Sequence, residues 1–225
     1  MNEEETVLLS NYALSKGADG VLVISPYYFS LSEREIQHYY DTVCGKIKGN
    51  VYLYNFPART GYDISPQTTL ELLRCHENIA GYKDTVSEMG HTRALIQTVS
   101  EEFPDFEIFS GFDEFMLHNM LSGGSGCIGG LSNIYPELAF AWVRAVDGRD
   151  FEACENIQGI VDQLMEIYSV AENFVPVIKA GVRNRGIEIG IECRNPLAPL
   201  TKKQNNHLAA IMTACEDRMR ACHIL

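Results

Sequence analysis

The sequence lacks the patterns that point to a membrane protein, a disulfide framework or a metal site. No apolar run approaches the ~20 residues that a membrane-spanning helix needs, and the first residues, Met-Asn-Glu-Glu-Glu, do not resemble a signal peptide. The seven cysteines form no C-x-x-C pair, and the six histidines form no H-x-x-x-H pair. We therefore expect free thiols in a reducing compartment, a cytoplasmic location and no bound metal.

Basic residues are also scarce. The chain has 18 lysines and arginines against 30 acidic residues, which gives a net charge of −12. This charge argues against nucleic acid and anionic membranes as partners. A G-x-G-x-x-G motif is missing after the first apolar segment, Gly20–Ser25, and its absence disfavours a dinucleotide-binding fold.

The sequence does contain short apolar segments that recur at regular intervals. They are rich in β-branched or aromatic residues, and loop residues follow each of them, which is typical of strands. The five segments are Gly20–Ser25, Val51–Asn55, Ile79–Lys83, Phe106–Gly111 and Gly126–Gly130.

Helical patterns fill the intervals between these segments. Ser32 with Glu35 predicts a capping box, Ser65 with Pro66 predicts a second helix start, and residues 90–102 carry an apolar face. Strand and helix alternating at this period predict an α/β fold with a parallel sheet, although a closed barrel needs eight strands. Further helices are expected at about 136–147, 151–169, 173–184 and 201–222.

Candidate site residues stand where the predicted strands end. Lys83 ends the third apolar segment, Tyr54 lies near the end of the second, Gly111 ends the fourth, and Asp113 follows it. Burial disfavours the ammonium form of a lysine, and a neutral amine can condense with a ketone to form a Schiff base. Active sites of barrel enzymes are built from several strands at this edge.

Four segments resemble signature segments of the dihydrodipicolinate synthase / N-acetylneuraminate lyase family, in the family's order and near its spacing. They are Ser25–Tyr28, Tyr54–Gly61, Gly81–Thr85 and Ser110–Glu114. The resemblance implies a (β/α)8 barrel with a C-terminal helical extension. Residues 1–133 would hold strands four to eight, and residues 134–225 the last barrel helix and the extension.

The chain departs from the family pattern at its amino-terminal side. Family members carry roughly 70 further residues there, with the first three of the eight strands that a barrel requires. Those residues include a Gly-Thr-Thr-Gly-Glu turn that binds the keto-acid carboxylate, and the present sequence has no such turn.

The resemblance also implies roles for individual residues. Lys83 matches the Schiff-base lysine, and Tyr54 matches the tyrosine that shuttles a proton. A bound cofactor is not implied, because the imine forms between Lys83 and the substrate. The small-molecule partners would be a keto acid (pyruvate) and an aldehyde, and a homo-oligomer, tetramer or dimer, is expected. Thr85, Gly111 and Ile128 match pocket positions, and Tyr28 matches a tyrosine that reaches a neighbouring subunit's site.

Two features bear on the substrate. Arg59 stands where the synthases have an arginine that binds a second carboxylate substrate. Asp113 and Glu114 resemble the acidic residues with which lyases and aldolases accept hydrogen bonds from sugar hydroxyls. The segments Lys83–Thr85 and Gly90–Arg93 are similar to aldolases acting on 2-keto-3-deoxy sugar acids, and we favour this activity. The alternatives are 4-hydroxy-tetrahydrodipicolinate synthase, N-acetylneuraminate lyase and a non-catalytic keto-acid-binding relative.

Several of these residues also have purely structural interpretations. Arg59 is able to cap a loop or pair with Asp63, and the acidic pair Asp113 and Glu114 is able to begin a helix. His91 is predicted to be a helix surface residue, and Cys127 a small core residue.

Overall fold

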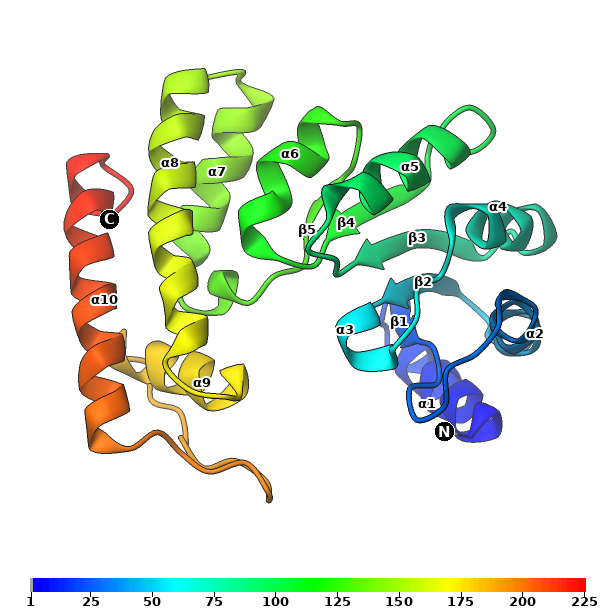
Figure 1. Ribbon diagram of the computed structural model, residues 1–225, viewed down its shortest axis with the longest axis horizontal. Helices are drawn as coiled ribbons and strands as arrows, with labels where there is room; N and C mark the ends of the chain where they lie inside the picture. The colour runs from blue at the N-terminus through cyan, green and yellow to red at the C-terminus, as the bar shows by residue number, and fades with distance from the viewer. Residues whose placement is uncertain (1) are drawn as a thin grey trace. The chain divides into compact units, whose positions relative to one another are not determined.

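The computed structural model describes residues 2–225 (Figure 1). They divide into a first compact unit that ends at Ile128 and a second that begins at Gly129. No helix within residues 2–225 is both long enough and apolar enough to cross a membrane.

A parallel sheet forms the centre of the first unit. Within residues 2–128 its order is β1-β2-β3-β4-β5, and each strand pairs in parallel with the next. The predicted α/β fold with a parallel sheet is therefore confirmed. The strands are β1 (Gly20–Ile24), β2 (Asn50–Asn55), β3 (Ile79–Asp84), β4 (Glu107–Ser110) and β5 (Gly126–Cys127).

The strand β5 is shorter than the segment Gly126–Gly130 that was expected to form it. Pairing stops after Cys127, and Gly129 and Gly130 follow without joining the sheet. Glycine loses more conformational entropy than other residues when a strand fixes its backbone, so a glycine-rich stretch extends a strand poorly.

The helices of the first unit begin where their capping residues predict. Ser32 and Glu35 form the expected capping box, and the Ser65 hydroxyl accepts a hydrogen bond from the Thr68 backbone N–H at 3.1 Å. These side chains satisfy backbone donors that have no partner inside the helix. The helices are α1 (Glu3–Ser15), α2 (Glu33–Cys44), α3 (Pro57–Thr60), α4 (Pro66–Cys75), α5 (Met89–Val99) and α6 (Met116–Leu121), with a 3-10 turn η1 (Asp113–Phe115).

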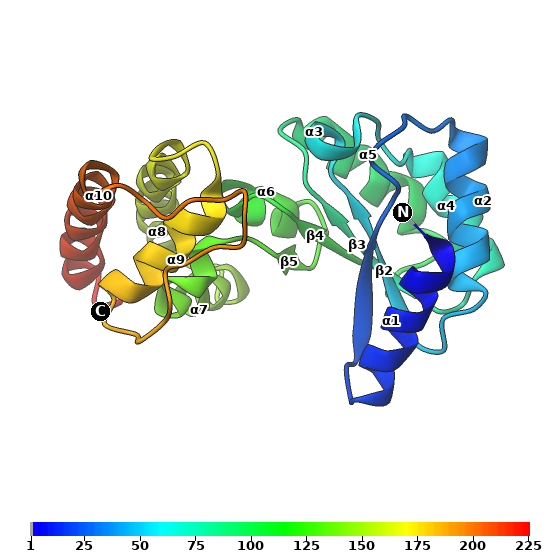
Figure 2. The ribbon, with the colours of Figure 1, turned by 90° about the horizontal axis from the view of Figure 1, so that it is seen from below.

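One face of the sheet packs against helices, and Figure 2 shows α1, α2 and α4 on that side of the strands. Val51 and Leu53 of β2 and Tyr82 of β3 are fully buried in this layer. Burying each such side chain contributes about 1.5–3 kcal/mol. Because side chains alternate along a strand, Tyr54 and Lys83 point to the opposite face, where Leu22 of β1 is 41% exposed.

The second unit is helical, as the sequence predicts. Its core includes Trp142, Ile160, Leu164 and Leu208. Its elements are η2 (Leu131–Asn133), α7 (Pro136–Asp147), α8 (Phe151–Leu164), η3 (Met165–Ser169), α9 (Phe174–Asn184) and α10 (Lys202–Ala221).

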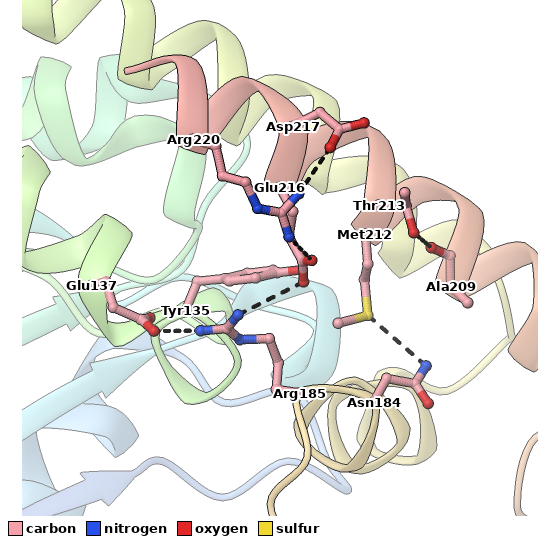
Figure 3. Close-up of polar contacts among 10 residues, drawn as sticks. All are labelled: Tyr135, Glu137, Asn184, Arg185, Ala209, Met212, Thr213, Glu216, Asp217 and Arg220. Carbon is pink, nitrogen blue, oxygen red and sulfur yellow. Dashed lines mark hydrogen bonds and ion pairs between the residues drawn. The ribbon is translucent and has the colours of Figure 1, made fainter. Parts of the chain in front are cut away.

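A polar network joins three helices of this second unit (Figure 3). The guanidinium of Arg185, which caps α9, lies 5.0 Å from the centroid of the Tyr135 ring and pairs with Glu137 of α7. The Tyr135 hydroxyl donates to Glu216 of α10 at 3.1 Å. Burial and the Glu216 carboxylate raise the pKa of Tyr135, so its hydroxyl remains a donor.

Candidate active site

Lys83 and Tyr54 meet at the carboxyl ends of two adjacent strands. They are register partners in β2 and β3, and the Lys83 ammonium lies 4.5 Å from the centroid of the Tyr54 ring. A lysine placed over an aromatic face is attracted by the ring quadrupole. The structure therefore brings together the two residues to which the sequence assigned the chemistry.

A second contact lies two residues nearer the amino-terminal end of β2 and joins this strand to β4. The Tyr52 hydroxyl donates to Glu107 of β4 at 2.6 Å, and this bond raises the pKa of Tyr52 to about 12. Gly81 makes room for the tyrosine, because a Cβ there would lie 2.6 Å from the Tyr52 ring and from the Glu107 carbonyl oxygen. Tyr52 therefore lies on the same face of β2 as Tyr54, two residues before it.

Thr85 and Gly111 lie against each other beside Lys83. A Cβ added to Gly111 would stand 1.9 Å from Thr85 Oγ1, so only glycine fits at this position. The Thr85 hydroxyl is buried and makes no hydrogen bond within residues 2–225. A buried hydroxyl of this kind is a candidate for binding a polar ligand group.

Asp113 and the residues around β5 also lie at the carboxyl end of the sheet. Asp113 is buried in the 3-10 turn η1, and the Ile128 backbone N–H donates to the Ser110 carbonyl oxygen at 2.9 Å. Burial and the nearby Asp113 raise the pKa of the Cys127 thiol to about 12, so the thiol stays neutral. Ile128 is 39% exposed at this end of the sheet.

A row of aromatic rings lies between Arg59 and Tyr54 and continues to Phe112. Its guanidinium lies 5.7 Å from the centroid of Phe56, whose ring stacks on Tyr54 with centroids 6.1 Å apart. Phe112 meets Phe56 edge-on at 6.2 Å. The sequence does not predict this row, and its only signal is a phenylalanine inside each of two family-like segments, Tyr54–Gly61 and Ser110–Glu114.

Tyr28 lies on the loop after β1. Its side chain is 84% exposed, and its ring packs edge-on against Phe29 with centroids 4.9 Å apart. The structure therefore places Tyr28 on the surface of the first unit and not in contact with Lys83 or Tyr54.

The sequence analysis also does not predict a hydrogen-bond network around Asp84, on the helix-covered face of the sheet. The Asp84 carboxylate accepts hydrogen bonds from Asn55 at 2.9 Å, from Thr92 at 2.6 Å and from His91 at 2.9 Å. The prediction that His91 is a surface residue is wrong, because the first turn of α5 faces the end of β3 and turns the imidazole inward. The signal for this network in the sequence is a polar residue after each of the two candidate residues: Asn55 after Tyr54, and Asp84 after Lys83.

Within residues 2–225 no three His, Cys, Asp or Glu side chains cluster as metal ligands.

Comparison with known proteins agrees with this arrangement. The sequence profile of the dihydrodipicolinate synthetase family matches residues 1–215. The chain is 34% identical over 211 residues to a probable 2-dehydro-3-deoxy-D-pentonate aldolase, YjhH, of Escherichia coli K12, covering 94% of this chain and 70% of that protein. It is also 34% identical over 215 residues to a 4-hydroxy-tetrahydrodipicolinate synthase of Haloarcula marismortui, covering 96% and 69%.

Solved structures show the same likeness. The crystal structure of YagE, a protein of the dihydrodipicolinic acid synthase family from E. coli K12, in complex with pyruvate superimposes with a TM-score of 0.92 at 31% identity. The match covers 96% of this chain and 72% of YagE. The family profile and these relatives lead to one conclusion: the chain belongs to the dihydrodipicolinate synthetase family of lyases.

Proposed function

We propose that this protein is a Schiff-base aldolase that reversibly cleaves a 2-keto-3-deoxy sugar acid to pyruvate and an aldehyde. The observation that carries the proposal is the Lys83 amine lying 4.5 Å from the centroid of the Tyr54 ring at the end of a parallel sheet. The relatives named as sugar-acid aldolases, and the pyruvate bound to YagE, support this substrate class.

In the proposed mechanism, the Lys83 amine adds to the C2 ketone and water leaves as the imine forms. The protonated imine accepts the electron pair of the breaking C3–C4 bond and becomes an enamine. Tyr54 takes the proton of the C4 hydroxyl as the aldehyde departs, which is general base catalysis. Protonation of the enamine at C3 and addition of water to the imine then release pyruvate and restore the amine. No metal ion or dissociable cofactor takes part in these steps.

The exposed face of the sheet supports our proposal that its five strands are part of a (β/α)8 barrel. The helices α1, α2 and α4 pack on one side of β1 to β3, whereas Leu22 on the other face is 41% exposed. Parallel sheets are normally covered on both faces. We propose that β1 to β5 correspond to strands four to eight of a (β/α)8 barrel, and that exposed Tyr28 contacts a second copy of the chain in a homo-oligomer.

The test is to incubate the protein with pyruvate and borohydride and to locate the adduct by peptide mass spectrometry. Reduction of the imine should attach the three-carbon acid to Lys83, and Lys83→Ala should give no adduct and no turnover. Lys16→Ala is the matched control, because Lys16 caps α1 on the surface. Turnover that survives in Lys83→Ala would overturn the proposal. An adduct without turnover on any aldehyde would indicate a keto-acid-binding protein.

A second activity is favoured by Arg59. Its guanidinium lies within the aromatic row beside Tyr54, where it is able to pair with a carboxylate of a second substrate. A carboxylate-binding arginine would suit a 4-hydroxy-tetrahydrodipicolinate synthase, and the Haloarcula relative carries that name. Assaying the unreduced enzyme with pyruvate and either aspartate semialdehyde or a sugar aldehyde distinguishes the two activities.

A further inference from the structure

Hydrogen bonds connect the end of strand β3, at Asp84 and Thr85, to β4, to β2 and to α5. The Asp84 carbonyl oxygen accepts from the Gly111 backbone N–H at 2.7 Å, and the Thr85 backbone N–H donates to the Asn55 carbonyl oxygen at 2.9 Å. These bonds join β3 to β4 and to β2. The Asp84 side chain, which is fully buried, joins the same point to α5 through His91 and Thr92.

The position of the Lys83 side chain depends on these hydrogen bonds, because Lys83 directly precedes Asp84. Successive side chains of a strand point to opposite faces, so Asp84 enters the helix layer while Lys83 faces the open side. Movement of the Asp84 backbone would therefore move the Lys83 amine relative to the Tyr54 ring, which is its register neighbour.

The hydrogen bonds of His91 require a charged ring. Nδ1 faces the Asp84 carboxylate at 2.9 Å, and Nε2 faces the Ile64 carbonyl oxygen at 3.2 Å. Both partners are acceptors, and only an imidazolium carries an N–H on each nitrogen. Either neutral tautomer would leave a ring lone pair against an oxygen lone pair.

The surroundings of His91 favour this charged form. Burial alone lowers the pKa of the imidazole, but the hydrogen bond and charge of Asp84, followed by the charge of Asp63, outweigh burial and raise the pKa above its ordinary value. The Tyr82 ring lies 6.5 Å away, and burial keeps its hydroxyl protonated. Asp84 and Asp63 are therefore the charges that face the ring.

We propose that the ion pair between buried Asp84 and partly buried His91 is a positioning element for Lys83, and that imine formation weakens when His91 loses its proton. The inference rests on the proposed Schiff-base chemistry at Lys83. Neither residue of the pair touches the substrate. The pair acts by holding the end of β3 in the register that places the amine beside Tyr54.

The test compares two histidine–aspartate pairs of the same unit. His76 pairs with Asp41 at 2.8 Å and lies before the start of β3, whereas His91 binds at its end. His91→Gln and the matched control His76→Gln each remove one such pair. For each protein the rate of borohydride-trapped adduct formation with pyruvate is measured across pH, together with the melting temperature.

The expected result separates positioning from folding. His91→Gln should slow adduct formation about tenfold to a hundredfold, the usual cost of a misplaced reacting group. His76→Gln should lower the melting temperature but leave the adduct rate within about twofold of the wild type. The wild-type rate should also fall on the alkaline side, and this fall should be absent in His91→Gln.

Two outcomes would overturn the inference. One is an adduct rate in folded His91→Gln that equals that of His76→Gln. The other is an NMR titration of the wild-type His91 ring that does not coincide with the alkaline fall, and this measurement stands even if His91→Gln does not fold. If the wild type forms no adduct at any pH, the proposed function itself fails, and the inference fails with it.

Discussion

At the scale of single residues, the site combines an amine, an aromatic ring and a buried hydroxyl. Lys83 lies over the Tyr54 ring, and Thr85 offers a hydroxyl without a partner within residues 2–225. An imine reaction needs the amine to reach a ketone and needs a second group to move a proton. These two tasks can be separated by mutation.

Tyr54→Phe removes the hydroxyl and keeps the ring beneath Lys83. We expect cleavage to slow by about 10²–10⁴-fold, because general acid–base catalysis supplies that much. The pyruvate adduct at Lys83 should still form. Steady-state turnover and adduct mass measured on one preparation check this prediction, and an unchanged turnover rate would contradict it.

Gly111→Ala should disrupt the site through the backbone. The new methyl would stand 1.9 Å from Thr85 Oγ1 and 2.8 Å from Thr85 Cα, so Thr85 or β4 must shift. We expect a loss of about 1–3 kcal/mol in the free energy of unfolding, the usual effect of overpacking, together with loss of adduct formation. Urea unfolding and the borohydride trap measure the two effects. Gly90→Ala is the control, because a Cβ at Gly90 meets no atom within 4 Å.

At the scale of elements, helix boundaries follow their capping residues. In α10 the Thr201 hydroxyl accepts from the Gln204 backbone N–H at 3.3 Å, and the Gln204 side chain accepts from the Thr201 backbone N–H at 2.9 Å. This capping box satisfies donors that the first helical turn leaves open.

Thr201→Ala should therefore destabilise the second unit by about 1 kcal/mol. The matched control is Thr213→Ala in the middle of α10, where the exposed hydroxyl only bonds the Ala209 carbonyl oxygen of its own helix (Figure 3). We expect that control to change the free energy of unfolding little. Chemical denaturation of the three proteins gives the comparison, and equal effects of both substitutions would refute the capping argument.

At the scale of the whole molecule, charge networks join segments that are distant in sequence. Arg185 connects Glu137 and Tyr135 near the start of α7 to Glu216 of α10. Arg185→Ala would leave the Glu137 and Glu216 carboxylates without this cation, and we expect a loss of about 1–3 kcal/mol. Arg220→Ala, which removes a more exposed pair with Glu216, should cost less than about 1 kcal/mol. Thermal unfolding distinguishes the two variants, and equal losses would contradict the assignment.

The His91–Asp84 pair predicts how stability depends on pH. The pKa of His91 is higher in the folded protein than its ordinary value, so the folded state binds the proton more tightly. The pair's contribution is therefore complete below the unfolded pKa of about 6.5 and is lost as pH rises through the folded pKa. Urea midpoints should fall over that window in the wild type and change less in His91→Gln. Identical pH profiles for the two proteins would refute this prediction.

The sequence by itself determined the elements and the strand-end positions of Tyr54 and Lys83, the pair that we propose to react. The strands around Val51 and Ile79, and the helices that begin after Ser32 and Ser65, lie where apolar periodicity and capping predict them. These signals are local, because a strand or a cap depends on residues only a few positions apart. The strand-end positions of Tyr54 and Lys83 follow from the same patterns, and their motifs also identify the family.

Only the tertiary structure decided which polar residues lie at the strand ends that carry Tyr54 and Lys83. His91 was predicted to be a surface residue, yet it lies against Asp84 and the Ile64 carbonyl oxygen, 27 residues away in sequence. The row from Arg59 through Phe56 to Phe112 likewise joins α3 to the residue that precedes η1. Such contacts depend on which strands and helices become neighbours, and spacing along the chain does not encode that choice locally.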